Sequence, residues 1–252
     1  MLLVCDIGNS KIKSALFKDD KISSLKAFED TESLLNFFSG KKITAAAVSS
    51  VVPEKLQMLK EGFFALFKFN PIIINRNSKF NLNIDYKTPA TLGIDRICSA
   101  EGALYLHNLK YRYRKNSYII SVDFGTATTV NVIKYNSIFT GGLILPGIHM
   151  MFKSLNIETA QLPLVKPSEY ENTIGNSTKS SIASGVINST VGAINQVIEY
   201  LKQQNSKAVV KIFITGGNAK YILPYLNFDY NYEKGLVLYG IKAVYENIVK
   251  RQ

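Results

Sequence analysis

Apolar and polar residues follow two periods along this chain of 252 residues, the two-residue period of β-strands and the longer period of helices. Residues 1–7 form an apolar run, a short turn follows, and residues 11–17 alternate between apolar and polar side chains. The turn KDDK leads into a third strand, and the same order of strands and turns begins again at residue 117. The pattern predicts two copies of one three-strand unit, with Asp123 lying 117 residues after Asp6.

Helical spacing and turn residues predict the elements that follow each three-strand unit. Leu34, Leu35 and Phe38 share one face of a short helix, and Pro53 suits the first turn of another. Because each half begins with strands and continues into helices, the pattern predicts an α/β fold of two similar domains, with a central cleft between them. We place these domains at residues 1–115 and 116–252. The expected helices cover residues 31–38, 53–66, 94–107, 178–203 and 232–249, and further strands cover residues 43–51, 71–75, 138–146 and 209–217.

Composition narrows the class of protein. A hydrophobic content of 46% allows a large core. No apolar run reaches the roughly 18 residues that a membrane-spanning helix needs, and the N-terminus lacks the pattern of a signal peptide. We therefore expect a cytoplasmic protein with no membrane partner. Two cysteines, Cys5 and Cys98, are too few for a disulfide framework or a zinc set, so we expect buried thiols. We assign His107 and His149 to packing or surface roles.

The net charge of +11 raises the question of an anionic partner. The basic residues are scattered, and the densest cluster is KYRYRK at residues 110–115, which mixes tyrosines with basic side chains. Such a cluster could bind single-stranded nucleic acid by stacking and phosphate contacts. It also suits a solvated linker between the two halves, which we favour, and we do not expect nucleic acid as a partner.

An Asp-x-Gly turn ends the first strand of each unit, at Asp6 and Gly8 and again at Asp123 and Gly125. Glycine lets the backbone bend sharply, and the amides that follow can donate to phosphate oxygens. A carboxylate beside a phosphate requires a cation between the two groups. Further side-chain donors for phosphate come from Asn9, Ser10, Thr126, Thr128 and Thr129. The two turns together predict one nucleotide site.

The common motifs of other nucleotide and hydrolytic sites do not occur in the sequence. There is no G-x-x-x-x-G-K-[ST] loop and no G-x-G-x-x-G turn, and GGNAK at residues 216–220 resembles a P-loop only superficially. The chain has neither an H-E-x-x-H helix nor a G-x-S-x-G elbow. A P-loop, a Rossmann site, a zinc protease site and a serine hydrolase site are therefore not supported.

The duplicated strands with Asp-x-Gly loops resemble the superfamily of sugar kinases, actin and Hsp70-type ATPases, which implies two ribonuclease H-like domains. Within it, the motifs are most similar to those of the type III pantothenate kinases. They occur in the family's order and span nearly the whole chain. The blocks are DIGNSKIK at 6–13, TLGIDR at 91–96, DFGTATT at 123–129 and GGLILPG at 141–147, with support from IGNSTKSSIASG at 174–185 and ITGGNA at 214–219.

The resemblance implies a reaction, namely transfer of phosphate from ATP to pantothenate, giving 4′-phosphopantothenate in the first step of coenzyme A synthesis. It also implies a homodimer whose pocket is completed near the subunit interface, and the use of Mg²⁺ and a monovalent cation, K⁺ or NH₄⁺. The implied nucleotide contacts are Asp6, Ile7, Gly8, Asn9, Ser10, Lys11, Ile12, Lys13 and Thr126. The implied pantothenate contacts are Tyr86, Gly93, Ile94, Asp95, Arg96 and Thr178.

Four of these residues have distinct implied roles. Asp95 is the proton acceptor, and Arg96 is the partner of the pantothenate carboxylate. Asp123 binds the monovalent cation, and Asp6 holds Mg²⁺ through water. Retention of all four favours an enzyme over a non-catalytic transcriptional accessory protein on the same fold. A second alternative, another small-molecule kinase of the superfamily, would lack the combination of the G-x-D-R block with Tyr86.

The chain departs from the family pattern at two positions. Ser10 stands where threonine is usual, which keeps a hydroxyl group, so we expect binding to survive. Ser177 stands where asparagine is common, so a local hydrogen bond is expected to differ.

Overall fold

A computed structural model describes residues 1–18, 20–112 and 114–250. Asp19 of the predicted KDDK turn and Tyr113 of the basic cluster therefore lie outside the described residues. By their contacts the residues divide into two compact units. Unit 1 comprises Met1–Arg112, Asn136–Phe139 and Gly235–Gln252, and unit 2 comprises Tyr113–Tyr135 and Thr140–Lys234.

Unit 1 is built on a five-stranded mixed sheet in the order β3-β2-β1-β4-β5. Its first strand, β1, pairs antiparallel with β2 and parallel with β4, so it lies at the centre of the sheet. The strands are β1 (Leu2–Ile7), β2 (Ile12–Lys18), β3 (Lys21–Phe28), β4 (Ala45–Ser50) and β5 (Ile72–Ile74).

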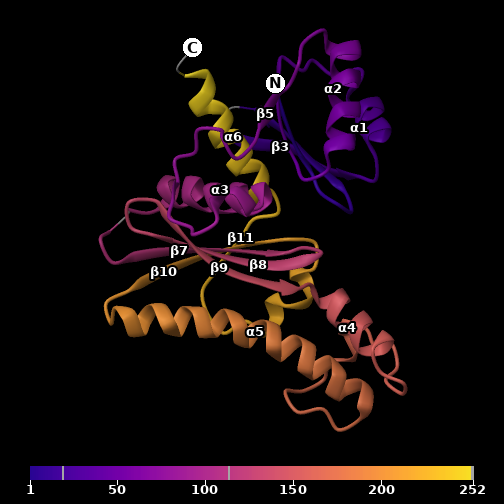
Figure 1. The fold of residues 1–252 in the computed structure, drawn as a ribbon, viewed down its shortest axis with the longest axis vertical. Coiled ribbons are helices and arrows are strands. Elements are labelled where there is room, and N and C mark those ends of the chain that lie inside the picture. The colour runs from indigo at the N-terminus through magenta and orange to yellow at the C-terminus, as the bar shows by residue number, and fades with distance from the viewer. Residues whose placement is uncertain (19, 113, 251–252) are drawn as a thin grey trace. The chain divides into compact units, whose positions relative to one another are not determined.

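Helices cover both faces of this sheet. On one face α1 (Thr31–Phe38) and α2 (Pro53–Phe67) pack beside each other (Figure 1), over a core that includes Cys5, Phe38 and Phe63. On the other face lie α3 (Ile94–Lys110) and α6 (Leu236–Val249). These two helices approach closely because Gly102 and Gly240 carry no side chain: a Cβ on Gly102 would lie 2.0 Å from the carbonyl oxygen of Leu236.

Unit 2 has a second mixed sheet, which contains β11 (Asn231–Tyr232), β10 (Val209–Thr215), β7 (Ser117–Phe124), β8 (Ala127–Lys134) and β9 (Ile138–Pro146) in that order. The long helix α5 (Thr178–Gln204) runs along one face (Figure 1). Its buried residues, among them Ile187 and Ile194, share a core with Val122 and with Phe152 of α4 (Ile148–Ile157). The short 3-10 helices of the chain are Pro89–Thr91, Pro167–Glu169, Ala219–Tyr221 and Leu223–Tyr225.

The two sheets repeat one topology. In each, the first strand lies between an antiparallel hairpin partner and a parallel strand that comes later in the chain, so β7, β8 and β10 correspond to β1, β2 and β4. One further strand, β6 (Asn83–Ile84), pairs with residues 138 and 139 of β9, and these paired residues belong to unit 1. The duplication predicted from the sequence is confirmed.

Most of the predicted elements are present within a few residues of their expected ends, and the helix at 31–38 agrees at both ends. The C-terminal helix was expected from residue 232, but residues 231–232 form β11 and the helix begins at Leu236, after Gly235. By its contacts this helix belongs to unit 1, whereas the sequence pattern predicted that it belongs to the second domain, residues 116–252. In the part of the chain that is described, no helix is long and apolar enough to cross a membrane. Both cysteines are buried free thiols, as predicted.

Candidate functional site

The first aspartate turn lies at the end of the central strand of unit 1. Asp6 is half-buried, and on the neighbouring strands Lys13 and Ser49 occupy the register positions beside it. The hydroxyl of Ser49 donates to Oδ1 of Asp6 at 2.9 Å, which holds the carboxylate in place. The turn that follows is closed by the amide of Gly8, which donates to the carbonyl oxygen of Lys11 at 3.1 Å. The fold therefore presents a fixed carboxylate beside an exposed turn.

Within that turn Asn9, Ser10 and Lys11 are exposed, whereas Ile7 and Ile12 are buried on either side of it. Lys11 makes an ion pair with Glu29 through atoms 3.0 Å apart. These polar side chains are thus accessible to a ligand, and the apolar residues anchor the turn to the sheet.

The second aspartate turn has the same surroundings in unit 2. Asp123 is half-buried at the end of β7, beside Thr129 of β8 and Thr215 of β10 in the strand register. The exposed residue Thr126 follows it. Two distant segments support this turn. The amide of Gly147, in the GGLILPG block, donates to the carbonyl oxygen of Thr126 at 3.1 Å.

The other support comes from the ITGGNA block. The side-chain amide of Asn218 donates to the carbonyl oxygen of Gly125 at 2.9 Å, and its backbone amide donates to that of Phe124 at 3.0 Å. Gly216 has φ +103°, and a Cβ there would lie 2.4 Å from the backbone of Phe124. Three of the sequence blocks therefore meet around residues 123–126.

The G-x-D-R block forms the start of helix α3. Gly93 is the N-cap residue, and Asp95 lies exposed in the first turn, where an acidic side chain interacts favourably with the helix dipole. A Cβ on Gly93 would lie 2.4 Å from Oδ1 of Asp95. The carboxylate therefore occupies the space that a side chain at position 93 would need, and the glycine determines where this carboxylate can lie.

Arg96 is only 5% exposed and lies against a pair of aromatic rings. Its guanidinium carbon is 5.9 Å from the ring centre of Tyr86 and 5.8 Å from that of Phe139, and the two rings meet edge to face at 6.0 Å. Aromatic faces attract a guanidinium group and restrict its orientation. Tyr86 and Arg96, expected to share a pocket, are thus neighbours within unit 1.

The buried thiol of Cys98, on helix α3, lies near both Asp6 and Asp95 in unit 1. Burial raises the pKa of this thiol, and the negative charges of Asp6, Glu101 and Asp95 raise it further, while a hydrogen bond with Ser49 acts in the opposite direction. Ser49 hydrogen-bonds both Asp6 and this thiol, and Cys98 lies within one turn of Asp95 on α3, so the end of β1 lies near the first turns of α3. Unit 1 therefore brings the expected magnesium ligand near the expected proton acceptor.

Thr178 is the first residue of helix α5, and Ser177 is its N-cap. Ser177 and Ser180 form a reciprocal capping box, in which the Ser177 hydroxyl accepts from the Ser180 amide at 3.2 Å. Serine and asparagine are both good N-cap residues, which explains why the departure at position 177 leaves the helix start intact.

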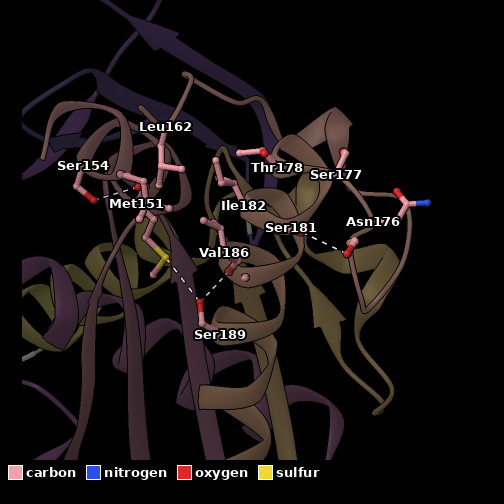
Figure 2. Close-up of a pocket in the computed structure, with 13 residues that line it drawn as sticks. Met151, Ser154, Leu162, Asn176, Ser177, Thr178, Ser181, Ile182, Val186 and Ser189 are labelled. Atoms are coloured by element: carbon pink, nitrogen blue, oxygen red, sulfur yellow. Dashed lines mark hydrogen bonds between the residues drawn. The ribbon is translucent and has the colours of Figure 1, made fainter. Parts of the chain in front are cut away.

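A pocket of about 1020 Å³ lies beside this helix start in unit 2 (Figure 2). Hydroxyl groups and apolar side chains line it together: Ser181 donates to the carbonyl oxygen of Gly175 at 3.2 Å, and Met151 and Ile182 supply apolar surface. The pocket thus suits a small ligand with both polar and apolar parts.

The histidines do not take part in these arrangements. His107 is buried in the last turn of α3, and His149 is exposed, with its ring 5.6 Å from that of Tyr221. Over residues 1–18, 20–112 and 114–250, no three His, Cys, Asp or Glu side chains are grouped closely enough to hold a metal ion by themselves. Any cation here would need oxygens from water, hydroxyl groups or a bound phosphate as well.

Sequence reasoning missed several residues that shape these sites. Ser49 supports Asp6, Phe139 encloses Arg96, and Asn218 holds the second turn. Asn218 lies in the ITGGNA block, and its position directly after two glycines indicates a tight turn near a functional site. Ser49 and Phe139 carry no such indication, because each becomes relevant only through strand pairing and packing.

Comparison with known proteins extends this description. Residues 2–200 match the sequence profile of the type III pantothenate kinase family. A relative named type III pantothenate kinase from Sulfurihydrogenibium sp. (strain YO3AOP1) is 33% identical over 255 residues, covering 96% of this chain and 98% of the relative. Another of that name, from Fervidobacterium nodosum (strain ATCC 35602 / DSM 5306 / Rt17-B1), is 36% identical and covers 98% of this chain and 97% of its own.

Solved structures add the fold. A glucokinase from an Antarctic psychrotroph aligns with a TM-score of 0.53 at 15% identity, covering 98% of each chain. A ROK hexokinase from Thermus thermophilus aligns with a TM-score of 0.52 at 12% identity, covering 98% of this chain and 99% of its own. These likenesses confirm the predicted fold of the actin-like and sugar-kinase-like ATPases. Because the family profile and the full-length relatives agree, this chain belongs to the type III pantothenate kinase family.

Proposed function

We propose that the protein transfers the γ-phosphoryl group of ATP to the primary hydroxyl of pantothenate, giving 4′-phosphopantothenate, with Asp95 as the proton acceptor. Family membership supports the reaction. The observation that carries the residue assignment is the contact between Gly93 and Asp95, which aims an exposed carboxylate from the start of α3. Buried Arg96 follows it directly, so one short block offers both a proton acceptor and a cation for an anionic substrate.

For the nucleotide we assign the turn from Asp6 to Lys13, together with Thr126. Exposed Asn9 and Ser10 offer donors to phosphate oxygens, and the fixed carboxylate of Asp6 suits a magnesium ion held through water. When bound, Mg²⁺ neutralises charge on the phosphate oxygens during transfer. Asp6 would hold this ion through water, and the hydrogen bond from Ser49 would keep the Asp6 carboxylate in place for that role.

Asp123 is our candidate for a monovalent cation site, occupied by K⁺ or NH₄⁺. Neighbours across strands point to the same face of a sheet, so Thr129 and Thr215 place their hydroxyl groups on the same side as this carboxylate. One carboxylate with two hydroxyl groups on its side of the sheet suits a large, weakly hydrated cation better than Mg²⁺, which demands regular octahedral geometry.

For pantothenate we assign Tyr86, Gly93, Ile94, Arg96 and Thr178. Arg96 would pair with the pantothenate carboxylate, since a guanidinium group forms two parallel hydrogen bonds to a carboxylate. The rings of Tyr86 and Phe139 already restrict its orientation, which lowers the cost of ordering it on binding.

The proton moves late in this scheme. An aspartate carboxylate is a much weaker base than an alkoxide, so Asp95 cannot remove the hydroxyl proton before the new bond forms. It first accepts a hydrogen bond from the substrate hydroxyl and so aims the oxygen at phosphorus. As the bond between the substrate oxygen and the γ-phosphorus forms, the proton passes to the Asp95 carboxylate. The bond between this phosphorus and the leaving ADP breaks in the same step.

We also propose that the protein acts as a homodimer, as its family resemblance implies, and in the cytoplasm, as we expect from its sequence. Light scattering coupled to size-exclusion chromatography tests this state directly. A single species at the monomer mass of 28.1 kDa, at the concentration of the activity assay, would contradict it.

The reaction is tested with purified protein, ATP, Mg²⁺ and pantothenate, with and without potassium, by following the phosphorylated product. Asp95→Asn should fold and bind both substrates but lose about 10²- to 10⁴-fold in kcat, the usual scale for an acid–base group. Near-normal turnover in this variant would remove Asp95 from its role. A wild-type chain that yields no product under any salt condition would instead favour the accessory-protein alternative.

The cation assignment has its own test. Asp123→Ala should weaken the dependence of turnover on potassium, because the carboxylate that attracts the ion is gone. Titration of KCl against wild type and variant measures this. If both respond to potassium identically, the cation lies elsewhere.

A further inference from the structure

Helix α3 carries a second acidic residue, Glu101, which has no role in the proposed phosphoryl transfer. Glu101 lies nearly two turns after Asp95 and is 0% exposed. Its carboxylate accepts hydrogen bonds from the backbone amide of Asn81 at 3.1 and 3.2 Å, from the Asn81 side chain at 2.5 Å, and from the amide of Leu82 at 3.2 Å. A buried carboxylate is therefore bonded to one short segment of the chain.

Such an arrangement needs a reason, since burying a carboxylate is costly unless it is well hydrogen-bonded. Burial raises the pKa of the Glu101 carboxyl, and the donors from Asn81 and Leu82 act in the opposite direction. An apolar side chain would fill the same volume at lower cost. The carboxylate differs from such a side chain in one respect: it joins helix α3 to the backbone of residues 81–82.

The joined segment leads directly to the substrate residues. After Leu82 the amide of Asn83 donates to the carbonyl oxygen of Ser137, and the amide of Asp85 donates to that of Phe139, each at 2.9 Å. Tyr86 comes next, with its ring against Phe139 and over Arg96. The chain then returns to α3 at Gly93. Residues 83–92, which include β6 and the 3-10 helix Pro89–Thr91, therefore form a connecting segment, here called the Tyr86 loop, with both ends held on one helix, at Glu101 and at Gly93.

We propose that Glu101 is a positioning residue of the pantothenate site, which fixes the start of this loop and so sets the place of Tyr86 over Arg96. The assignment rests on the proposed function, because it takes Tyr86 and Arg96 as pantothenate contacts. Glu101 touches neither Tyr86 nor Arg96 by any of these hydrogen bonds, so it acts through the loop. Its loss should weaken pantothenate binding while leaving the chemistry at Asp95 and the nucleotide turn unchanged.

The test is Glu101→Gln, which keeps the size of the side chain. It replaces one carboxylate oxygen, an acceptor, by an NH₂ group, a donor, which then faces the N–H donors of Asn81. We expect the KM for pantothenate to rise about tenfold, the factor that corresponds to about 1.4 kcal/mol. The kcat and the KM for ATP should stay within about twofold, which a general loss of structure would not allow. Hydrogen–deuterium exchange at the amides of residues 81 and 82 should become faster, because the Asn81 amide keeps only one of its two acceptor oxygens and both amides then donate to a neutral group instead of a carboxylate.

Three further variants test the role of Glu101 more closely. Adding Asn81→Asp to Glu101→Gln lets the new amide group donate to a carboxylate at position 81, so the KM and the exchange rates should return toward those of wild type. The matched control is Glu246→Gln, which changes a carboxylate on the neighbouring helix α6 that bonds Lys242 and should leave the pantothenate KM unchanged. If Glu101→Gln does not fold, Asn81→Ala removes one donor from an exposed residue and should still raise this KM.

The outcomes distinguish a failure of the role of Glu101 from a failure of the proposed reaction. An active wild type whose Glu101→Gln variant exchanges faster but keeps its pantothenate KM overturns the role of Glu101 alone. A parallel rise of both KM values overturns it too, because the effect is then not specific to the loop. A wild type that makes no phosphopantothenate refutes the proposed function, and this assignment with it.

Discussion

The contact between Gly93 and Asp95 can be tested by adding a single methyl group. In Gly93→Ala the backbone need not change, because φ −60° and ψ 135° are ordinary values for alanine. The added Cβ would lie 2.4 Å from Oδ1 of Asp95, and the carboxylate must move by about 1 Å to reach ordinary van der Waals contact. It can do so, since it is the end of an exposed side chain. The variant should therefore fold, with a loss of at most about 1 kcal/mol from the altered N-cap.

The catalytic effect should be much larger than this structural one. A misplacement of about 1 Å at a reacting group costs about 10²-fold in rate, or about 2.7 kcal/mol in activation free energy. Steady-state kinetics should therefore show kcat falling by about that factor while the KM for ATP is retained. Thermal unfolding followed by circular dichroism checks the fold. The control is Gly40→Ala, where an added Cβ meets nothing within 4 Å.

A double-mutant cycle makes the interpretation sharper. If alanine at position 93 acts by displacing the carboxylate, it should cost little once Asp95→Asn has already removed the proton acceptor, so the two effects should not add. A folded Gly93→Ala variant with kcat within about threefold of wild type would refute the reasoning, as would full additivity with Asp95→Asn.

Three further outcomes follow from local contacts. Ser177→Ala should destabilise the protein by about 1 kcal/mol through loss of the capping box, whereas Ser177→Asn should be nearly neutral, as urea unfolding can measure. Gly216→Ala should cost more than about 2 kcal/mol in the same assay, because φ is +103° and the new Cβ meets the Phe124 backbone; a small loss would contradict that geometry. The hydrogen bond from Lys242 lowers the pKa of Asp20, so this carboxylate stabilises the fold only while it is ionised. Asp20→Asn should then cost less than about 1 kcal/mol at pH 7, and the difference should begin to shrink near the ordinary pKa of 3.8 and be lost as the pH falls through the lowered pKa of folded Asp20; a difference that does not shrink in acid would contradict the assignment.

Local pattern predicted much of the fold. The start of the helix at 31–38 is encoded locally, because Asp30 is an N-cap that accepts from the Ser33 amide, and the apolar face of the helix includes Leu34 and Phe38. The helix at 148–157 was missed because it has neither a side-chain cap nor charged residues at its ends that mark them. The start of the last helix was expected at Tyr232, but Asn231 and Tyr232 pair with β10 and the helix begins only at Leu236, after Gly235.

Some residues of the candidate site could be found from the sequence, and others only from the structure. Asp6, Asp123 and the G-x-D-R block could be found from the sequence because each belongs to a short motif whose chemistry is local. Glu101 and Phe139 could not, because their relevance comes from Asn81 and Arg96, which lie far from them along the chain.

By itself the sequence determined the positions of most strands and helices, the duplication and the residues suited to phosphate chemistry, since the period of apolar side chains and the turn residues act over short distances. Only the tertiary structure decided that the last helix packs on α3, that Ser49 holds Asp6, and that a buried glutamate holds the Tyr86 loop. Strand register and helix packing bring together residues that are distant in the chain, and no local pattern specifies those partners.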